Sequence, residues 1–348
     1  MGEGLSASEV VGGPNSPAST QLVPGSLAPS GQRFGLAIII LNYRTPQLTL
    51  DCLASLAAQV DPAVIDVVVL DNASGDGSAE AIEQGIEQAD WAAWARVVRS
   101  RENGGFSAGN NLGVRSVDAQ AYLFLNSDTI VRPGAVGSIL RAVGQTGGVV
   151  GAHLEWPDGR EQENRRAYSR PLHELARGAQ TSVISRWAGR SLPEATTGSA
   201  GLIAAPWLSF ACIAVARGVI EAIGGLDDGF FMYFEDMDYC RRAAEVGFRV
   251  AMAPDARVVH LKGGTSPVQS QTAALARRPA YYYAARSRYF AKHYGRFGLW
   301  RANLAWHAGR VIGWLREVVG HKPPHACERE SSDIWIGWRA PLRPWRPR

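Results

Sequence analysis

Five polar segments of the chain contain residues whose types could support chemistry. Four of them follow apolar runs and occupy residues 42–45 (NYRT), 71–77 (DNASGDG), 103–111 (NGGFSAGNN) and 126–129 (NSDT), and the fifth is residues 235–238 (EDMD). Glycine and other small residues in such loops allow the backbone to approach a phosphate-bearing ligand closely. Taken singly, each loop also fits a turn or a helix N-cap, so the inference depends on their occurring together.

Two of these segments supply carboxylates suited to proton transfer and metal binding. Asp236 follows an aromatic run, where desolvation raises the pKa of a carboxyl group toward that of a general base, and Glu235 lies beside it. Asp128 is a candidate ligand for Mg²⁺ or Mn²⁺, and His260 is a second. Structural alternatives stay open: Asp128 as a helix cap, His260 as an ordinary residue after a strand, and acidic residues that stabilise the start of a helix.

The elements that must position these residues alternate along the chain from Phe34. Apolar runs predict strands at 36–41, 64–70, 95–99 and 122–125, and amphipathic stretches predict helices after Pro46 and over 78–88. Strands that are apolar on both faces indicate an α/β fold with a doubly wound, mostly parallel sheet covered by helices on both faces. Ligands of such sheets bind at the carboxyl ends of the strands, where the four polar loops begin.

A Rossmann dinucleotide site fits this pattern poorly. Its G-x-G-x-x-G fingerprint follows the first strand, whereas residues 42–46 contain no glycine and the glycine-rich loop follows the third strand. Asp71 does occupy the acidic position at the end of the second strand. Recognition of a single nucleotide by Tyr43 and Asp71 therefore stays open.

Composition bounds the class of protein. With 348 residues, 46% of them hydrophobic, the chain is able to bury a full core, which excludes general disorder and a small disulfide scaffold. Residues 257–348 contain 17 Lys and Arg against 4 Asp and Glu, a balance of 17 − 4 = +13, whereas residues 1–256 contain 19 against 28, a balance of −9. The basic end indicates a negatively charged partner. Four cysteines, which lie far apart at Cys52, Cys212, Cys240 and Cys327, predict neither a disulfide framework nor a metal cluster and indicate a reducing compartment.

The two ends of the chain differ from its body. Residues 1–33 are rich in Gly, Ser, Pro and Ala and are expected to be a disordered leader rather than a signal peptide. Residues 195–216 contain no charge, but their glycines and proline favour buried strands over a membrane span. We expect residues 271–320 to form a basic, aromatic helical extension. Residues 321–348 are expected to form a tail rich in Pro, Arg and Trp.

An apolar stripe runs along the extension, formed by Trp300, Leu304, Val311, Leu315 and Val318. The stripe fits either an interfacial helix on an anionic membrane surface or a helix packed on the body. Nucleic acid is not expected as a partner, because no recognition motif accompanies the basic and aromatic residues.

The ordered set of motifs resembles the inverting glycosyltransferases of family 2, which have the GT-A fold. The resemblance covers about residues 35–295, and its motifs are Asn42-Tyr43-Arg44, Asp71-Asn72-Ala73-Ser74, Asn103-Gly104-Gly105-Phe106 with Gly109-Asn110, Leu125 to Thr129, Phe231 to Asp238 and Val259-His260. Within the family the chain looks most like bacterial rhamnosyltransferase-like members that build cell-surface polysaccharides. Residues 34–270 would then form the catalytic domain, with a nucleotide-sugar half at 34–150 and an acceptor half at 151–270.

The resemblance implies a role for each motif. Binding of the nucleoside diphosphate sugar, such as dTDP-rhamnose, would involve Asn42, Tyr43, Arg44, Asp71, Asn103, Gly109, Asn126 and Ser127. Asp128 and His260 would bind Mg²⁺ or Mn²⁺, although Asn126-Ser127-Asp128 lacks the first carboxylate of the usual Asp-x-Asp motif. Asp236 would be the catalytic base, with Glu235 as acceptor ligand or substitute base. Trp207 and Ser209 would lie on the acceptor side, where Phe210 replaces the usual glycine and either narrows the acceptor pocket or packs beneath it.

The resemblance also implies the reaction and the location. The acceptor would be a saccharide or a polyprenyl-diphosphate-linked sugar, and the protein would be cytoplasmic, at the inner face of the plasma membrane. Two alternatives stay open. One is a galactofuranosyl, glucosyl or other hexosyl transferase of the same fold, and the other is a catalytically silent scaffold that binds nucleotide sugars.

Overall fold

The computed structural model describes residues 33–187, 201–261, 267–321 and 323–347. All but the last residue of the predicted leader 1–33 lies outside these ranges. The uncharged stretch 195–216 contains short strands in its described part. Within the described ranges, no helix combines the length and the apolar character that crossing a membrane requires.

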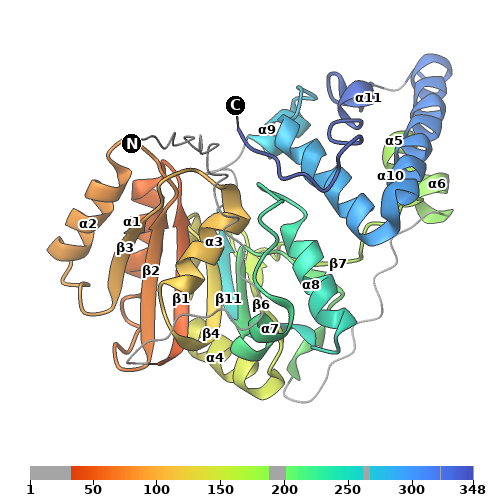
Figure 1. The fold of residues 1–348 in the computed structure, drawn as a ribbon. Helices are drawn as coiled ribbons and strands as arrows, with labels where there is room; N and C mark the ends of the chain where they lie inside the picture. Colours follow the sequence, from red (N-terminus) through yellow and green to blue (C-terminus); the bar gives the residue numbers. More distant parts are fainter. Residues whose placement is uncertain (1–32, 188–200, 262–266, 322, 348) are drawn as a thin grey trace, which may run out of the picture.

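A nine-stranded sheet forms the centre of the molecule (Figure 1). Its strands are β1 (Phe34–Asn42), β2 (Ile65–Asp71), β3 (Ala95–Arg99), β4 (Ala119–Asn126), β5 (Thr129–Val131), β6 (Val149–Glu155), β8 (Ile203–Ala204), β10 (Cys212–Ala216) and β11 (Val250–His260). The order is β3-β2-β1-β4-β10-β6-β11-β5, with β8 on β11. The four strands predicted from the sequence, β1 to β4, are confirmed and run parallel in adjacent positions. The inserted strand β10 is antiparallel to both β4 and β6.

Helices cover both faces of the sheet, as the sequence predicts. One face packs against α1 (Pro46–Leu56), α2 (Ser78–Gln88) and α4 (Ala135–Thr146), and the other against α3 (Gly105–Arg115), α7 (Arg217–Ile223), α8 (Glu235–Glu245) and part of α10 (Ala280–Val319). Helix α1 begins with Pro46, whose fixed φ angle suits the first helical position. The two apolar cores lie on opposite faces of the same strands because successive side chains of a strand point to opposite faces.

Close packing of α3 places a glycine-rich loop at the carboxyl edge of the sheet. A Cβ atom on Gly109 would lie 2.5 Å from Leu41 Cδ1, and one on Gly113 would lie 2.4 Å from Ile39 Cγ2. Both glycines therefore allow the helix to approach β1 more closely than a larger residue would permit. Gly105, at the start of the helix, has a φ angle of +84°, which favours glycine.

The chain ends in a helical unit built around α10, which is kinked at Gly295. Its other helices are α5 (His173–Ala179), α6 (Ser182–Trp187), α9 (Val268–Ala273) and α11 (Glu330–Asp333), and a two-stranded sheet of β7 (Arg165–Arg166) and β9 (Trp207–Leu208) lies between it and the body. Gly178 of α5 and Gly309 of α10 face each other so closely that a Cβ on either would meet backbone atoms of the opposing helix at 2.3 Å or less. The helical extension is therefore packed on α5.

The second half of α10 has two distinct faces. Ala302, Trp306 and Gly309 are buried on the side toward α5. The predicted apolar stripe is on the opposite side, where Trp300 is 47% exposed and Val311 is 59% exposed. The helix therefore packs on the rest of the protein and still presents an apolar face to its surroundings.

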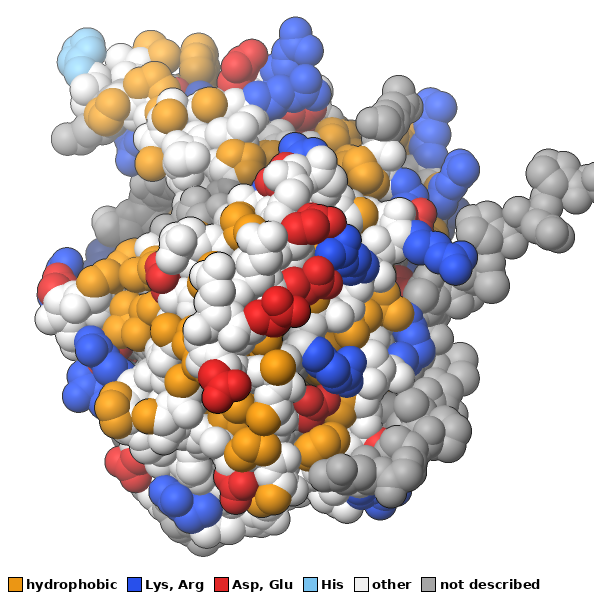
Figure 2. Space-filling view, turned by 90° about the vertical axis from the view of Figure 1, so that its left-hand side faces the viewer, with side chains coloured by type: hydrophobic (Ala, Val, Ile, Leu, Met, Phe, Trp, Pro, Cys, Tyr) orange, Lys and Arg blue, Asp and Glu red, His pale blue; other side chains and the backbone are white. Residues whose placement is uncertain are grey.

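The side of the molecule that carries α2 has a mixed surface (Figure 2). Acidic and basic side chains lie next to one another there, and Arg99 pairs with Glu80 and Glu83 of α2 at 2.5 and 2.6 Å. Such exposed pairs contribute little to the free energy of folding. This face has the character of an ordinary solvated surface.

Candidate active site

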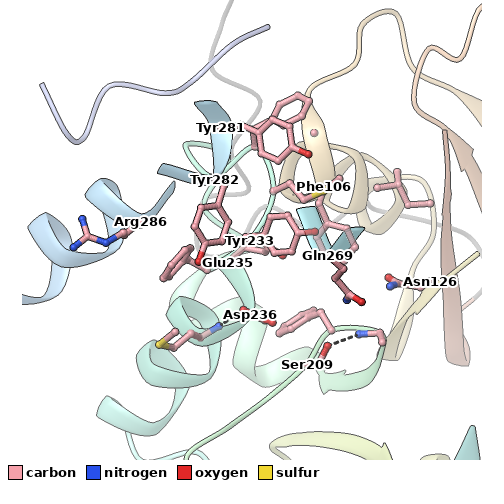
Figure 3. A pocket seen from close by; sticks show the side chains of 18 of the residues that line it. Phe106, Asn126, Ser209, Tyr233, Glu235, Asp236, Gln269, Tyr281, Tyr282 and Arg286 are labelled. Carbon is pink, nitrogen blue, oxygen red and sulfur yellow. Dashed lines mark hydrogen bonds between the residues drawn. The ribbon is translucent and has the colours of Figure 1, made fainter. Parts of the chain in front are cut away.

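A cavity of about 710 Å³ opens where the strands β1, β2 and β4 end (Figure 3). Its lining comes from the predicted donor loops, from α8 and from the helical extension, and includes Tyr43, Asn72, Asn103, Phe106, Asn126, Ser127, Asp128, Trp207, Ser209, Phe231, Tyr233, Glu235, Asp236, His260, Gln269, Tyr281 and Tyr282. Asn126 lies on one side of this space and Asp236 on the other, with the rings of Tyr233, Tyr281 and Tyr282 above Asp236. The fold thus brings the polar loops and the acidic segment to a single cavity.

The predicted nucleotide-binding residues fall into two groups. Four of them, Tyr43, Asn103, Asn126 and Ser127, line the cavity, whereas among the described residues Asn42, Arg44, Asp71 and Gly109 are not part of its lining. The second group supports the loops. Asn42 Nδ2 donates to Asp71 Oδ1 at 2.8 Å, and the same oxygen accepts a hydrogen bond from Ser74 Oγ at 2.6 Å. These bonds tie the loop after β1 to the loop after β2, and a direct contact of this group with a nucleotide stays a prediction.

Arg44 holds the tyrosine that lines the cavity. Its φ angle of 58° is unusual for a residue with a side chain and turns the chain sharply after β1. Its Nε donates to the carbonyl oxygen of Ser74 at 3.0 Å, and its guanidinium lies 5.2 Å from the centre of the Tyr43 ring. Tyr43 is therefore held by a cation–π contact at the edge of the cavity, where the sequence predicts the donor.

Asp128 and His260 form a candidate metal-binding pair. Pairing of β5 with β11 places them next to each other, with His260 Nε2 3.4 Å from Asp128 Oδ1. Both side chains are buried, and Asp128 Oδ1 and His260 Nδ1 have no hydrogen-bond partner. Within the described ranges, no group of three His, Cys, Asp or Glu side chains is arranged to hold a metal ion. The two residues fit a cation that takes its remaining ligands from phosphate oxygens and water.

The acidic segment opens α8 after a strained turn. Tyr233 and Phe234 have φ angles of 72° and 69°, a left-handed conformation that bulky residues rarely adopt and that is common at functional sites. The turn directs Glu235 and Asp236 into the cavity (Figure 3). Glu235 is buried and its Oε2 has no hydrogen-bond partner, whereas Asp236 Oδ1 accepts a hydrogen bond from the backbone of Met237 at 2.8 Å.

Burial changes the protonation of both carboxyl groups. Desolvation raises the pKa of Asp236 to about 6, in the range of an efficient general base. Burial and the adjacent charge of Asp236 raise the pKa of Glu235 well above its ordinary value. Both carboxyl groups therefore ionise at a higher pH than exposed carboxyl groups do.

A third carboxylate of the segment anchors the helix. Asp238 is fully buried and contacts Arg242, with Nε and Oδ2 2.9 Å apart. Lys292 and His293 of α10 also lie 2.8 Å from its Oδ1. Burial alone would raise the pKa of Asp238, but the bond to His293 and the charges of Arg242 and Lys292 lower it below its ordinary value. The helical extension thus holds the helix that bears the candidate base.

The predicted acceptor residues line the cavity beside the acidic segment. Trp207 and Ser209 belong to this wall, and Ser209 Oγ accepts a hydrogen bond from the backbone of Ala211 at 3.4 Å. Phe210 also borders the cavity but packs beneath it, with its ring centre 5.4 Å from that of Phe124 and 5.8 Å from that of Tyr239. Phe210 thus packs beneath the cavity, and the assignment of this wall to the acceptor stays a prediction.

Sequence reasoning missed several lining residues, above all Trp345 of the tail and Arg166 of β7. The Trp345 ring lies 4.9 Å from that of Phe231, and Arg288 of α10 donates a hydrogen bond to the Leu342 carbonyl, which holds the tail in place. The unusual content of Trp, Pro and Arg in the tail is a signal for a special role. Nothing in the local sequence pattern of the tail indicates which part of the protein the tail packs against.

Comparisons with known proteins identify the family. Residues 33–284 match the family model described as "Glycosyltransferase like family 2". The chain belongs to this family. An N-acetylglucosaminyl-diphospho-decaprenol L-rhamnosyltransferase of Mycobacterium tuberculosis is 27% identical to this glycosyltransferase over 292 residues, which cover 78% of this chain and 88% of that protein. The predicted membership in family 2, with a rhamnosyltransferase among its relatives, is confirmed.

Two solved structures have folds similar to that of this family 2 glycosyltransferase. TarS of S. aureus has a TM-score of 0.50 and 14% identity, covering 89% of this chain and 80% of that one. GalNAc-T7, solved with UDP, GalNAc and Mn²⁺, has a TM-score of 0.55 and 14% identity, covering 89% and 59%. Likeness at this level of identity concerns the fold alone, and it confirms the predicted GT-A type α/β architecture.

Proposed function

We propose that this family 2 glycosyltransferase moves a rhamnose or a related deoxyhexose from a nucleoside diphosphate, such as dTDP-rhamnose, to a polyprenyl-diphosphate-linked sugar, with inversion of configuration. The name of the mycobacterial relative supports a lipid-linked acceptor and a rhamnosyl donor. Synthesis of a cell-surface polysaccharide is the corresponding cellular role.

One observation carries the proposal: a carboxyl pair with raised pKa values faces the same cavity as the donor loops. Asp236, whose pKa of about 6 suits a general base, removes the proton of the acceptor hydroxyl. The hydroxyl oxygen then bonds to the anomeric carbon of the donor sugar while the bond from that carbon to the diphosphate oxygen breaks. A single displacement of this kind inverts the anomeric centre, and the proton stays on Asp236.

Glu235 has a different part in this scheme. The raised pKa of Glu235 favours its protonated form, which is able to donate a hydrogen bond as well as accept one. Its Oε2 is buried without a partner and borders the cavity. Glu235 therefore orients the acceptor by a hydrogen bond to a sugar hydroxyl, and Asp236 takes the proton.

Asp128 and His260 are proposed as the ligands of Mg²⁺ or Mn²⁺. Their unpartnered buried atoms, Asp128 Oδ1 and His260 Nδ1, support this role because a buried polar group without a partner is costly. When bound, the cation neutralises negative charge on the departing diphosphate. Asn126 and Ser127, on the same loop, border the donor side of the cavity.

The exposed face of α10 is proposed to lie on an anionic membrane, where a lipid-linked acceptor is found. The face has Trp300, Leu304, Trp314 and Leu315, each between 41% and 53% exposed, and Arg301 is exposed beside them. Aromatic and aliphatic side chains next to cations suit the boundary between headgroups and acyl chains. The protein would then be a peripheral protein at the cytoplasmic side of the membrane.

Vesicle flotation tests this placement. The Trp300→Ser/Leu315→Ser variant should lose binding to anionic vesicles by roughly tenfold or more, since each buried apolar side chain contributes about 1.5–3 kcal/mol. Val246→Ser, which removes an apolar residue of the body that is 57% exposed, is the matched control. Equal flotation of the double variant and the native chain would exclude α10 as the contact.

A donor panel tests the reaction itself. Purified protein with Mn²⁺ is mixed with dTDP-rhamnose and other nucleotide sugars, and the melting temperature and transfer to a farnesyl-diphosphate-linked N-acetylglucosamine are measured. We expect dTDP-rhamnose to raise the melting temperature and to be consumed. Consumption of a different hexose donor would identify another hexosyl transferase, as in the relative named hexosyltransferase Agl10 of Haloferax volcanii, which is 23% identical over 232 residues, or 65% of this chain and 66% of that protein. Donor binding with no transfer from any donor would indicate a scaffold.

A further inference from the structure

Acidic side chains outnumber arginines in the described lining of the cavity. The described lining contains five carboxylates, Asp128, Glu163, Glu174, Glu235 and Asp236, and three arginines, Arg166, Arg177 and Arg286. Two of the arginines already bind carboxylates. Glu174 lies 2.8 Å from Arg177 and 2.9 Å from Arg286, and Arg177 also contacts Glu330. Ion pairs with these carboxylates of the protein therefore largely neutralise the positive charge of Arg177 and Arg286.

Arg166 differs from the other two. Among the described residues, no carboxylate lies within ion-pair distance of its guanidinium, and its side chain is exposed at the cavity. It is nevertheless held in place. Arg166 pairs with Trp207 across the two strands β7 and β9, and its guanidinium lies 5.9 Å from the centre of the indole ring. Trp207 Nε1 in turn donates to the Ala167 carbonyl at 3.0 Å, which fixes the ring.

Arg166 lies on the proposed acceptor side of the candidate base, Asp236. Trp207 and Ser209, its neighbours on β9 and just beyond, form the wall beside Asp236. Arg166 is also close enough to Asp236 for its charge to lower the pKa of that carboxyl, against the larger effect of burial. The donor diphosphate is assigned to Asp128, which directly precedes β5, and to His260, which ends β11, and neither residue belongs to this wall.

A lipid-linked acceptor brings a second diphosphate into this cavity. The diphosphate is attached to the sugar whose hydroxyl reacts, so it lies one sugar ring away from the attacking oxygen. In a cavity lined by carboxylates, such an anion needs a cation that has no partner of its own. An arginine suits the task because its planar fork binds two phosphate oxygens at once.

We propose that Arg166, held against Trp207, binds the diphosphate of the lipid-linked acceptor and so selects acceptors that have one. The inference rests on the proposed function, since it assumes a lipid-linked acceptor. It adds a binding residue for a part of the substrate that takes no part in the bond changes. It also gives a reason for an arginine next to Asp236 that has no carboxylate partner among the residues the structure describes.

The test compares Arg166→Ala and Arg166→Lys with Arg165→Ala. Arg165 is the neighbour on the same strand, but its Nε donates to the Ala204 carbonyl at 3.1 Å and it does not belong to the described lining. Titration calorimetry measures the Kd of farnesyl-diphosphate-linked N-acetylglucosamine, and kinetics measure its KM and the KM of the donor. Charged hydrogen bonds contribute about 1.5–3 kcal/mol, so Arg166→Ala should raise the acceptor Kd roughly ten- to a hundredfold. The lysine variant should recover part of the loss, and the donor KM should not change.

Two results would overturn the inference. One is an acceptor Kd for Arg166→Ala within twofold of that for Arg165→Ala. The other is an unchanged Kd together with a displaced pH profile of kcat, which would show that Arg166 acts only on the protonation of Asp236. Because calorimetry does not require turnover, absence of transfer in the native enzyme would count against the proposed function and leave the role of Arg166 to be decided by the Kd.

Discussion

Replacement of Asp236 by asparagine gives the most informative test of the site. The pKa of Asp236 is about 6 in the folded protein, against an ordinary value of 3.8. Each unit of difference corresponds to about 1.4 kcal/mol, so ionisation of this carboxyl group costs the folded state about 3 kcal/mol at neutral pH. Because the folded-state pKa is the higher one, the native state binds more protons between about pH 4 and pH 6, and stability falls as pH rises through this window.

The asparagine variant removes this cost. At pH 7.5 its free energy of unfolding should exceed that of the native protein by up to about 3 kcal/mol, and the two should converge below about pH 4, where both side chains are neutral. Transfer should fall by about 10²- to 10⁴-fold because the proton of the acceptor hydroxyl has no base to receive it. Activity of the native enzyme should rise with pH and reach half its maximum near pH 6.

Urea unfolding at several pH values between 4 and 8 measures the first effect, and initial rates of transfer measure the second. Asp255→Asn, which neutralises an exposed carboxylate of β11, is the control for a simple change of net charge. A variant at Asp236 that is no more stable than the native protein at pH 7.5 would refute the argument from burial. Undiminished transfer would remove Asp236 from the role of base and leave Glu235 as the candidate.

Three further predictions concern the surroundings of the base. Asp128→Ala should remove the dependence of donor affinity on Mn²⁺, measured by calorimetry with and without the ion; retained dependence would exclude Asp128 as a ligand. Trp345→Ala should raise the acceptor KM about three- to tenfold, as expected for loss of an aromatic contact, whereas Trp338→Ala, outside the described cavity lining, should not. Asp238→Ala should destabilise the fold by about 3 kcal/mol in urea unfolding, because it removes the buried carboxylate that Arg242, Lys292 and His293 share; a loss below 1 kcal/mol would contradict the anchoring role.

Much of the fold follows from local patterns. The apolar runs predict β1 to β4 because a strand buried on both faces must be apolar on both. Amphipathic spacing predicts α2 over Ser78–Gln88, as observed. The antiparallel direction of β10 is not visible in the sequence, since an apolar strand reads the same whichever way it runs.

The candidate site, too, is only partly predictable from local patterns in the sequence. Polar residues at the ends of parallel strands must meet at one edge, and Tyr43, Asn103, Asn126 and Asp128 do so. Which of the neighbouring side chains faces the cavity is a different matter. Asn42 and Asp71 have the residue types of ligand-binding groups, yet they hydrogen-bond to each other and to Ser74. Asn42 Oδ1 also accepts hydrogen bonds from Thr45 and Thr49. The relative position of the two loops decides whether such a side chain contacts a ligand or holds the loops together.

The sequence by itself therefore determined the first four strands, the order of the loops that follow them and the types of residue at the site, because each depends on short-range periodicity and on the direction of parallel strands. The tertiary structure alone decided which charges remain unpaired and which distant segments complete the cavity. Glu174 and Arg286 are 112 residues apart, and their pairing leaves Arg166 as a cation without a carboxylate partner among the described residues. Pairings of this kind depend on how α5, α10 and the tail pack, which no local pattern encodes.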